Sequence, residues 1–189
     1  MATEIEKNIL LYEEKFIGKE CNCLHRYEHG NDMPDIIVCD FTNSPSNDVC
    51  SYTTIGLHNV DIGLTSGGKK LRVELIGATY SEFTDFADIM SMAAHGIMES
   101  KRCCPGFILL NSISYYLQGS DMKHILMAIP RFWDDEIMVT DDTIISWLMI
   151  LPISDNEYKY AQEHGTEALE KLLEKNKVNV FDLYRKSVI

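Results

Sequence analysis

The residues with the clearest chemical potential are a run of acids between positions 131 and 142. Five carboxylates stand there with one base, Arg131, and two aromatic residues, Phe132 and Trp133. Such a run can form a solvated loop, dock a basic protein, or supply paired catalytic carboxylates that hold magnesium with His124. The acids are Asp134, Asp135, Glu136, Asp141 and Asp142.

These three interpretations differ in what else they require. A hydrolytic site needs a nucleophile, a phosphate loop or a second ligand cluster, and no such motif accompanies the acids. Aromatic anchors beside charge suit protein interfaces, whose buried centres provide most of the binding free energy. The sequence does not exclude the interpretation as a solvated loop. We expect no catalytic residues. The predicted partner-binding residues are Trp133, Asp134, Asp135, Glu136, Asp141 and Asp142.

A second cluster combines the residue types that bind zinc: Cys21, Cys23, His25 and His29. Its Cys-x-Cys spacing is tighter than that of common zinc sites, and no second half-site follows at standard spacing. Cys103 and Cys104 are far away in sequence, and their adjacency lacks the Cys-x-x-Cys spacing of redox pairs. We therefore expect no metal and no cofactor.

The segment 63–70 nearly fits a phosphate-binding loop, with Gly, four residues and then Gly-Lys. Lys70 stands where Ser or Thr should contact magnesium, and the following residues alternate like a strand. A phosphate loop needs a helix there, because the helix N-terminus supplies the donors. The segment instead predicts a hairpin turn at Gly67–Gly68.

Charge separates the possible partners. The chain has 189 residues, with 29 acids and 17 bases, and a net charge of −12. This balance argues against nucleic acid or an anionic membrane as the main partner, and it favours a basic protein. The first residues lack a basic start and an apolar segment, so we expect a cytoplasmic location. The length suits a single domain, residues 1–189.

The elements that must position these residues alternate between strand runs and helices. Thr3 and Glu6 form a capping box that opens a helix at 4–17, and Ser154 and Glu157 form another. Residues 82–100 show a helical period, while strands are expected at 35–41, 52–57, 60–64, 71–76, 125–129 and 144–151. The tail, 178–188, either adds a strand or lies over the sheet. Strands in runs favour an α+β fold, a mixed α/β sandwich, over a doubly wound parallel sheet.

Several of these segments resemble a known family in their order and residues. They are 72–77 (RVELIG), 124–130 (HILMAIP), 132–136 (FWDDE) and 145–158 (ISWLMILPISDNEY), continuing to 180–188 (VFDLYRKSV). This pattern is similar to the bacterial branch of the Suppressor of fused (SUFU) domain family and covers most of 50–189. The resemblance implies a mainly antiparallel or mixed sheet covered by helices, and a non-catalytic domain that binds proteins.

Within that family, the chain is similar to antitoxins, also called immunity proteins, that neutralise secreted polymorphic toxins. The resemblance implies a cognate toxin of the nuclease type as partner. Because nuclease clefts are cationic, an acidic surface could occupy one. The alternative implied by the family is a scaffold or regulator that captures a peptide along a sheet edge.

Overall fold

The computed structural model describes residues 3–28, 30, 33–134 and 137–189. The strands are β1 (Cys23–Tyr27), β2 (Ile36–Thr42), β3 (Val49–Ile55), β4 (Thr65–Ser66), β5 (Lys69–Tyr80), β6 (Ile108–Leu109), β7 (Met122–Ala128), β8 (Ile137–Val139) and β9 (Thr143–Ser154). The helices are α1 (Glu4–Ile17), the 3-10 helix η1 (Leu57–Asn59), α2 (Phe86–Ser100), α3 (Asp155–His164) and α4 (Thr166–Lys175). Across these described ranges, no helix combines the length and apolarity needed to cross a membrane.

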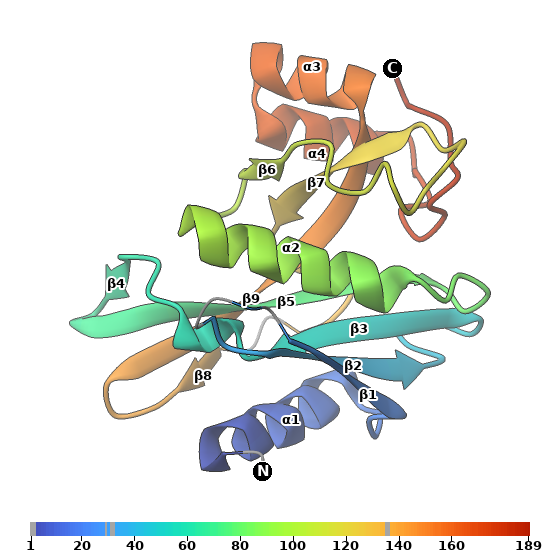
Figure 1. Ribbon diagram of the computed structural model, residues 1–189. Coiled ribbons are helices and arrows are strands. Elements are labelled where there is room, and N and C mark those ends of the chain that lie inside the picture. The colour runs from blue at the N-terminus through green and yellow to red at the C-terminus, as the bar shows by residue number, and fades with distance from the viewer. Residues whose placement is uncertain (1–2, 29, 31–32, 135–136) are drawn as a thin grey trace.

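The strands form one mixed sheet with helices on both faces (Figure 1). Its order is β1-β2-β3-β5-β9-β7-β6, with β4 attached to β5 and β8 attached to β9. The central strands β5 and β9 run parallel, and the other described pairs are antiparallel. This architecture confirms the α+β class with a mixed sheet.

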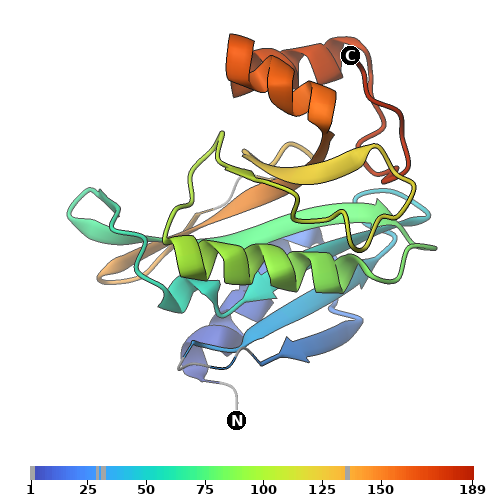
Figure 2. The same cartoon turned by 45° about the horizontal axis from the view of Figure 1, so that its top comes forward.

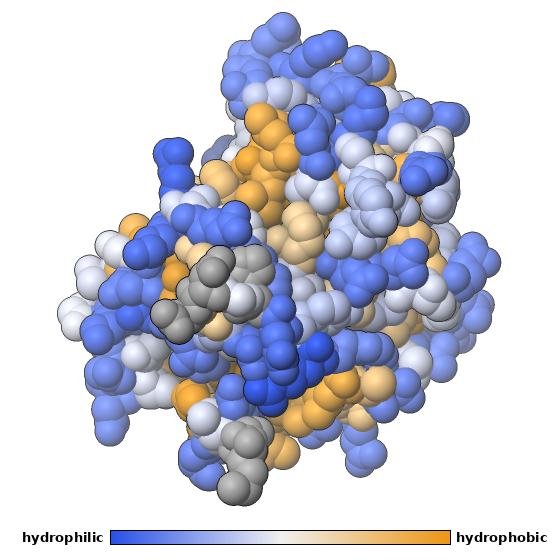
Figure 3. All heavy atoms as spheres, viewed as in Figure 1, coloured by the Kyte–Doolittle hydropathy of each residue, from blue (hydrophilic) through white to orange (hydrophobic). Residues whose placement is uncertain are grey.

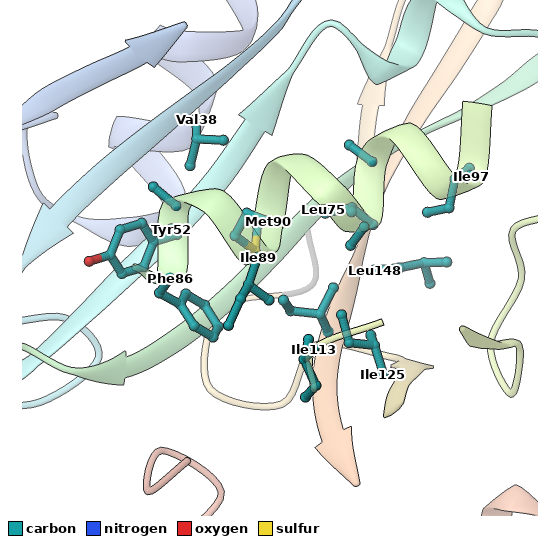
Figure 4. Close-up of a cluster of buried hydrophobic side chains, with 14 of the residues drawn as sticks. Val38, Tyr52, Leu75, Phe86, Ile89, Met90, Ile97, Ile113, Ile125 and Leu148 are labelled. Carbon is teal, nitrogen blue, oxygen red and sulfur yellow. The ribbon is translucent and has the colours of Figure 1, made fainter. Parts of the chain in front are cut away.

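Helix α2 covers one face of the sheet. Its apolar side chains recur at helical spacing and pack on alternate residues of the central strands, as Figure 4 shows for Leu75 and Leu148. Gly77 permits this close approach, because a Cβ there would lie 2.7 Å from the Ile150 side chain and 3.0 Å from that of Phe86. The largest hydrophobic cluster therefore lies between α2 and the sheet.

Helix α1 covers the opposite face (Figures 1 and 2). The predicted capping box is present, since Thr3 and Glu6 each accept a hydrogen bond from the other's backbone N–H. The Tyr12 ring stacks on Trp147 of β9, with centroids 5.5 Å apart. Amphipathic α1 thus closes the second hydrophobic cluster.

A carboxylate is buried inside this α1 interface. Glu13 is fully buried, and its oxygens accept hydrogen bonds from Thr53 Oγ1 at 2.8 Å and Trp147 Nε1 at 3.0 Å. Burial raises the pKa of Glu13 well above its ordinary value of 4.5, and the two hydrogen bonds oppose this rise only in part. The helix is therefore fixed to two strands by a group that burial favours in its neutral form.

The α3–α4 pair packs against β7 and β9, above α2 in the view of Figure 2. The capping box of α3 also serves the C-terminal tail. Its Glu157 is fully buried and binds the Arg185 guanidinium through two hydrogen bonds, at 2.6 and 2.9 Å. Arg185 also donates to the Pro152 carbonyl, so one bidentate ion pair fixes the tail to β9 and α3.

The fold departs from the sequence prediction at the strand edges. The hairpin at Gly67–Gly68 is confirmed, with φ angles of 57° and 80°. However, its first strand contains only Thr65–Ser66, so the prediction of a strand at 60–64 is wrong. There Asp61 accepts a hydrogen bond from the Gly63 N–H, a local turn that competes with strand pairing. The tail adds no strand within 178–188, and its Phe181 carbonyl accepts from Thr79 and Tyr80 of β5.

The buried Glu13 predicts an unusual dependence of stability on pH. Because its folded pKa is raised, its contribution to stability is present below the unfolded pKa and is lost as pH rises through the folded pKa. We expect the wild type to lose stability relative to Glu13→Gln as pH rises from 4.5 toward the folded pKa, by about 1.4 kcal/mol for each pH unit. Urea denaturation from pH 4 to 8 measures this difference. The exposed variant Glu20→Gln is the control, and parallel curves for wild type and Glu13→Gln would contradict the prediction.

Candidate partner-binding surface

The described residues of the acidic run form a loop and a hairpin beside β9. Residues 131–134 lead to β8, which returns through the turn at 140–142 into β9. Ile137 pairs with Ser146 and Val139 with Ile144, while the opposite edge of this part of β9 pairs with β5. Two of the predicted contact residues, Asp135 and Glu136, lie outside the described residues.

The tip of this hairpin is held by hydrogen bonds. Thr140 N–H donates to the Thr143 carbonyl at 2.8 Å, and Thr143 N–H donates to Thr140 Oγ1 at 3.1 Å. The Asp142 carbonyl accepts from Lys70 N–H of the neighbouring β4–β5 hairpin at 2.9 Å. Asp141 and Asp142 are therefore presented to solvent on an anchored turn.

The described acids do not gather in one place. Asp134 lines a hollow with Lys19 and Arg131, whereas Asp141 and Asp142 line another with Lys70 and Arg72. Strand β8 separates the two groups. The surface is therefore an acidic rim with bases nearby, and a continuous carboxylate cluster is absent from its described part.

Arg131, the base within the acidic run, forms its ion pairs with acids outside that run. Its guanidinium donates to Glu170 at 2.6 Å and to Glu174 at 3.4 Å, both on α4. The base inside the acidic run is thus paired with acids from another element, and it fixes the loop to α4.

An apolar strip lies between the two acidic groups. Ile137 and Val139 are 50% and 60% exposed and share one face of β8, while Met138 points into the α1-side cluster. Ile137 also lines an apolar hollow of about 270 Å³ with Leu64 and Ile129, which are exposed in part. Exposed apolar residues inside a charged rim have the composition of a protein interface. On the face shown in Figure 3, apolar patches likewise interrupt a mainly hydrophilic surface.

Trp133 differs from its predicted role as an exposed contact. Its side chain belongs to the α1-side hydrophobic cluster and is only 9% exposed. Its Nε1–H donates to Ser51 Oγ at 3.1 Å, which satisfies the indole inside the core. The neighbouring Phe132 is 42% exposed, and its ring packs on Phe181 at 4.8 Å. Of the two aromatic residues, only Phe132 is accessible to a partner in this arrangement.

His124 is also engaged in a structural contact. Its Nδ1 accepts from Asn111 N–H at 2.9 Å, and its Nε2 lies 3.0 Å from Asp155 Oδ1, so Nε2 carries the proton. Asp155 belongs to the first turn of α3 and also binds Lys123. Both ring nitrogens are used, which leaves His124 without a free nitrogen for magnesium or general base catalysis with Asp134.

The cysteines and histidines near the N-terminus lie differently from the predicted cluster. His29 lies outside the described residues, and Cys21 hydrogen-bonds through its thiol to the Cys23 carbonyl. Cys23 and His25 instead lie close to Asp40 of β2. Sequence spacing missed Asp40, because strand pairing and not local sequence brings it near. Elsewhere, burial raises the pKa of Cys103 to about 12, while Cys104 is exposed.

The family is decided by comparison with known proteins. The model of the family described as "Suppressor of fused protein (SUFU)" matches residues 30–186 of the chain. The chain belongs to the Suppressor of fused family. It is also 35% identical over 167 residues to the immunity protein YqcF of Bacillus subtilis (strain 168), a match that covers 87% of each protein.

Two solved structures show the same SUFU fold. A SUFU homologue from Neisseria gonorrhoeae FA 1090 superposes with a TM-score of 0.77 at 17% identity, covering 97% of this chain and 96% of that one. A chain of the Sufu–Fu complex superposes with a TM-score of 0.69 at 13% identity, covering 96% and 91%. At these identities the likeness establishes the SUFU fold, and it assigns no partner to this chain.

The burial of Trp133 can be tested by fluorescence. In a Trp147→Phe variant, Trp133 is the remaining tryptophan of the two in the chain. We expect weak quenching by acrylamide, because the indole is packed in the core. Adding Phe132→Trp to Trp133→Phe and Trp147→Phe moves the single indole one position and should increase quenching several-fold. Strong quenching of the Trp147→Phe variant, equal to that of the second protein, would show that Trp133 is exposed.

Proposed function

We propose that this SUFU protein is an antitoxin, or immunity protein, which neutralises a cognate toxin by stoichiometric binding in the cytoplasm. The observation that carries the proposal is the 35% identity to the immunity protein YqcF over 87% of both chains. A match over nearly the whole length, without large insertions on either side, favours a shared mode of action. The chain would act as a single domain without chemical turnover.

Charge supports a basic partner, and in particular a toxin of the nuclease type. A protein with net charge −12 is attracted to cationic surfaces, and clefts that hold nucleic-acid phosphates are cationic. Complementary charge raises the association rate and disfavours wrong partners. A nuclease toxin is therefore the class of partner that this charge fits best.

The hairpin surface described above supplies the contact region. We assign the contact to Asp134, Asp141 and Asp142, with Asp135 and Glu136 between them in sequence. Ile137 and Val139 would form the apolar centre that these acids surround. Trp133 would act from inside the core by holding the loop in place, through its bond to Ser51.

The engagement of His124 supports a non-catalytic role. The one histidine considered for hydrolysis is held by Asn111 and Asp155, and no described contact joins it to Asp134. The contacts of His124 with Asn111 and Asp155 stabilise the fold, and this role requires no substrate.

A second candidate function is capture of a peptide along a sheet edge. Strand β1 is the outer strand at one end of the sheet, and its Leu24 is exposed. An extended peptide could pair with its backbone, in which case main-chain hydrogen bonds would dominate the affinity. Affinity would then vary little with salt, whereas binding to the acidic hairpin would weaken as salt rises.

Charge reversal tests the antitoxin proposal and its surface together. The variant Asp134→Lys/Asp141→Lys/Asp142→Lys should slow association with the cognate toxin, sought among the products of the genes next to its own, by about tenfold or more, and should weaken protection of cells. The control Glu28→Lys/Glu163→Lys/Glu167→Lys reverses three exposed charges outside the hairpin surface and should bind like the wild type. Stopped-flow association at low and high salt provides the rates.

The outcomes separate the surface from the function. Full protection by the hairpin variant would contradict the contact assignment alone. Absence of any complex between the wild type and any toxin from these neighbouring genes would contradict the antitoxin function.

A further inference from the structure

Three metal-binding side chains meet on the α2 side of the first two strands. In a strand, alternate residues share a face, so Cys23 and His25 of β1 point to the same side. Cys23 pairs with Asp40 of β2, and His25 pairs with Val38, which packs in the α2-side cluster. Figure 4 shows Val38 and Tyr52, the neighbours of Asp40 along and across the sheet, directed toward α2.

Their spacing is close to that of a tetrahedral zinc site. One ligand atom from each of Cys23, His25 and Asp40 lies within 4.8 Å of the other two, and His25 Nε2 is 3.1 Å from Asp40 Oδ2. Normal zinc bond lengths place tetrahedral ligand atoms roughly 3.4–3.6 Å apart. Because Cys23 is exposed, rotation of its side chain can close the remaining difference.

Asp40 provides a second, independent observation. The residue is only 9% exposed, and its Oδ1 is buried without a hydrogen-bond partner. A buried carboxylate oxygen in this state costs free energy, and a bound cation is one of the few groups that can compensate it.

We propose that Cys23, His25 and Asp40 bind one zinc ion, whose fourth position is open to solvent. The combination of thiolate, imidazole and carboxylate matches the borderline character of zinc. On binding, the Cys23 thiol releases its proton to solvent, and the neutral His25 ring carries its proton on Nδ1 so that Nε2 is free to bind. Asp40 replaces its contact with His25 by a bond to the metal. The site would join β1, an edge strand, to β2 at the end of β1 where Cys23 lies.

This ligand set differs from the one that spacing suggested. The Cys21 thiol donates to the Cys23 carbonyl, and its side chain packs in the α1-side cluster together with that of Cys39. Cys21 is therefore directed away from Cys23 and His25. Asp40 of the neighbouring strand is the third ligand, where the local sequence motif suggested Cys21.

Metal uptake by the full, untagged chain after treatment with a chelator tests the proposal. Competition with a chromophoric chelator should show one equivalent of Zn²⁺ bound per wild-type chain. Co²⁺ should produce the charge-transfer absorption of a thiolate–cobalt bond. Cys23→Ser should abolish that absorption, and His25→Ala and Asp40→Asn should each weaken Zn²⁺ binding by more than about tenfold.

Matched controls make the result specific. Cys104→Ser and His164→Ala remove an exposed cysteine and an exposed histidine elsewhere, and they should bind metal like the wild type. The proposal is overturned if wild-type protein lacks the charge-transfer absorption, whatever the behaviour of the variants. It is also overturned if the controls lose Zn²⁺ as strongly as the ligand variants do.

Discussion

The parallel pairing of β5 with β9 is the constraint on which the other parts of the structure depend. Seven residue pairs join the two strands, from Lys70–Thr143 to Ile76–Met149. On one side, β5 continues into the antiparallel strands β3, β2 and β1; on the other, β9 carries β7, β6 and β8. Parallel strands are normally covered on both faces, and here α1 and α2 provide that cover. Without this pairing, the N-terminal and C-terminal strands would have no common sheet.

Buried carboxylates then fix the elements around this centre. Within the described residues, Glu13 joins α1 to the sheet, Glu74 accepts from the Gly56 and His58 N–H groups after β3, and Glu157 holds Arg185 of the tail. All three are fully buried, and each accepts at least two hydrogen bonds, as buried polar groups require. Some of the acidic residues of this protein thus join its elements from inside the fold, while the described acids of the hairpin remain at the surface.

Much of this fold could be predicted from local sequence. Capping boxes marked the starts of α1 and α3, the helical period marked α2, and glycines marked the β4–β5 turn. Each of these signals acts over a few neighbouring residues. The short strands β1 and β8 carry no such signal, because they form only by pairing with longer neighbours.

The candidate site was less predictable for the same reason. Sequence proximity suggested that Trp133 and its neighbouring acids share one exposed patch, but the indole turns into the core to reach Ser51, 82 positions away. Likewise, Asp40 joins Cys23 and His25 only through the β1–β2 register. Long-range packing decides both cases, and no local spacing encodes it.

We propose that this SUFU protein acts by occupying a toxin without turnover. The most direct measurement is the residual activity of the purified cognate toxin, at a concentration well above the dissociation constant, against increasing amounts of this protein. We expect a linear fall that ends near one equivalent. Complete inactivation by a small fraction of an equivalent would instead indicate catalysis, and undiminished activity at excess would show that the toxin is not its partner.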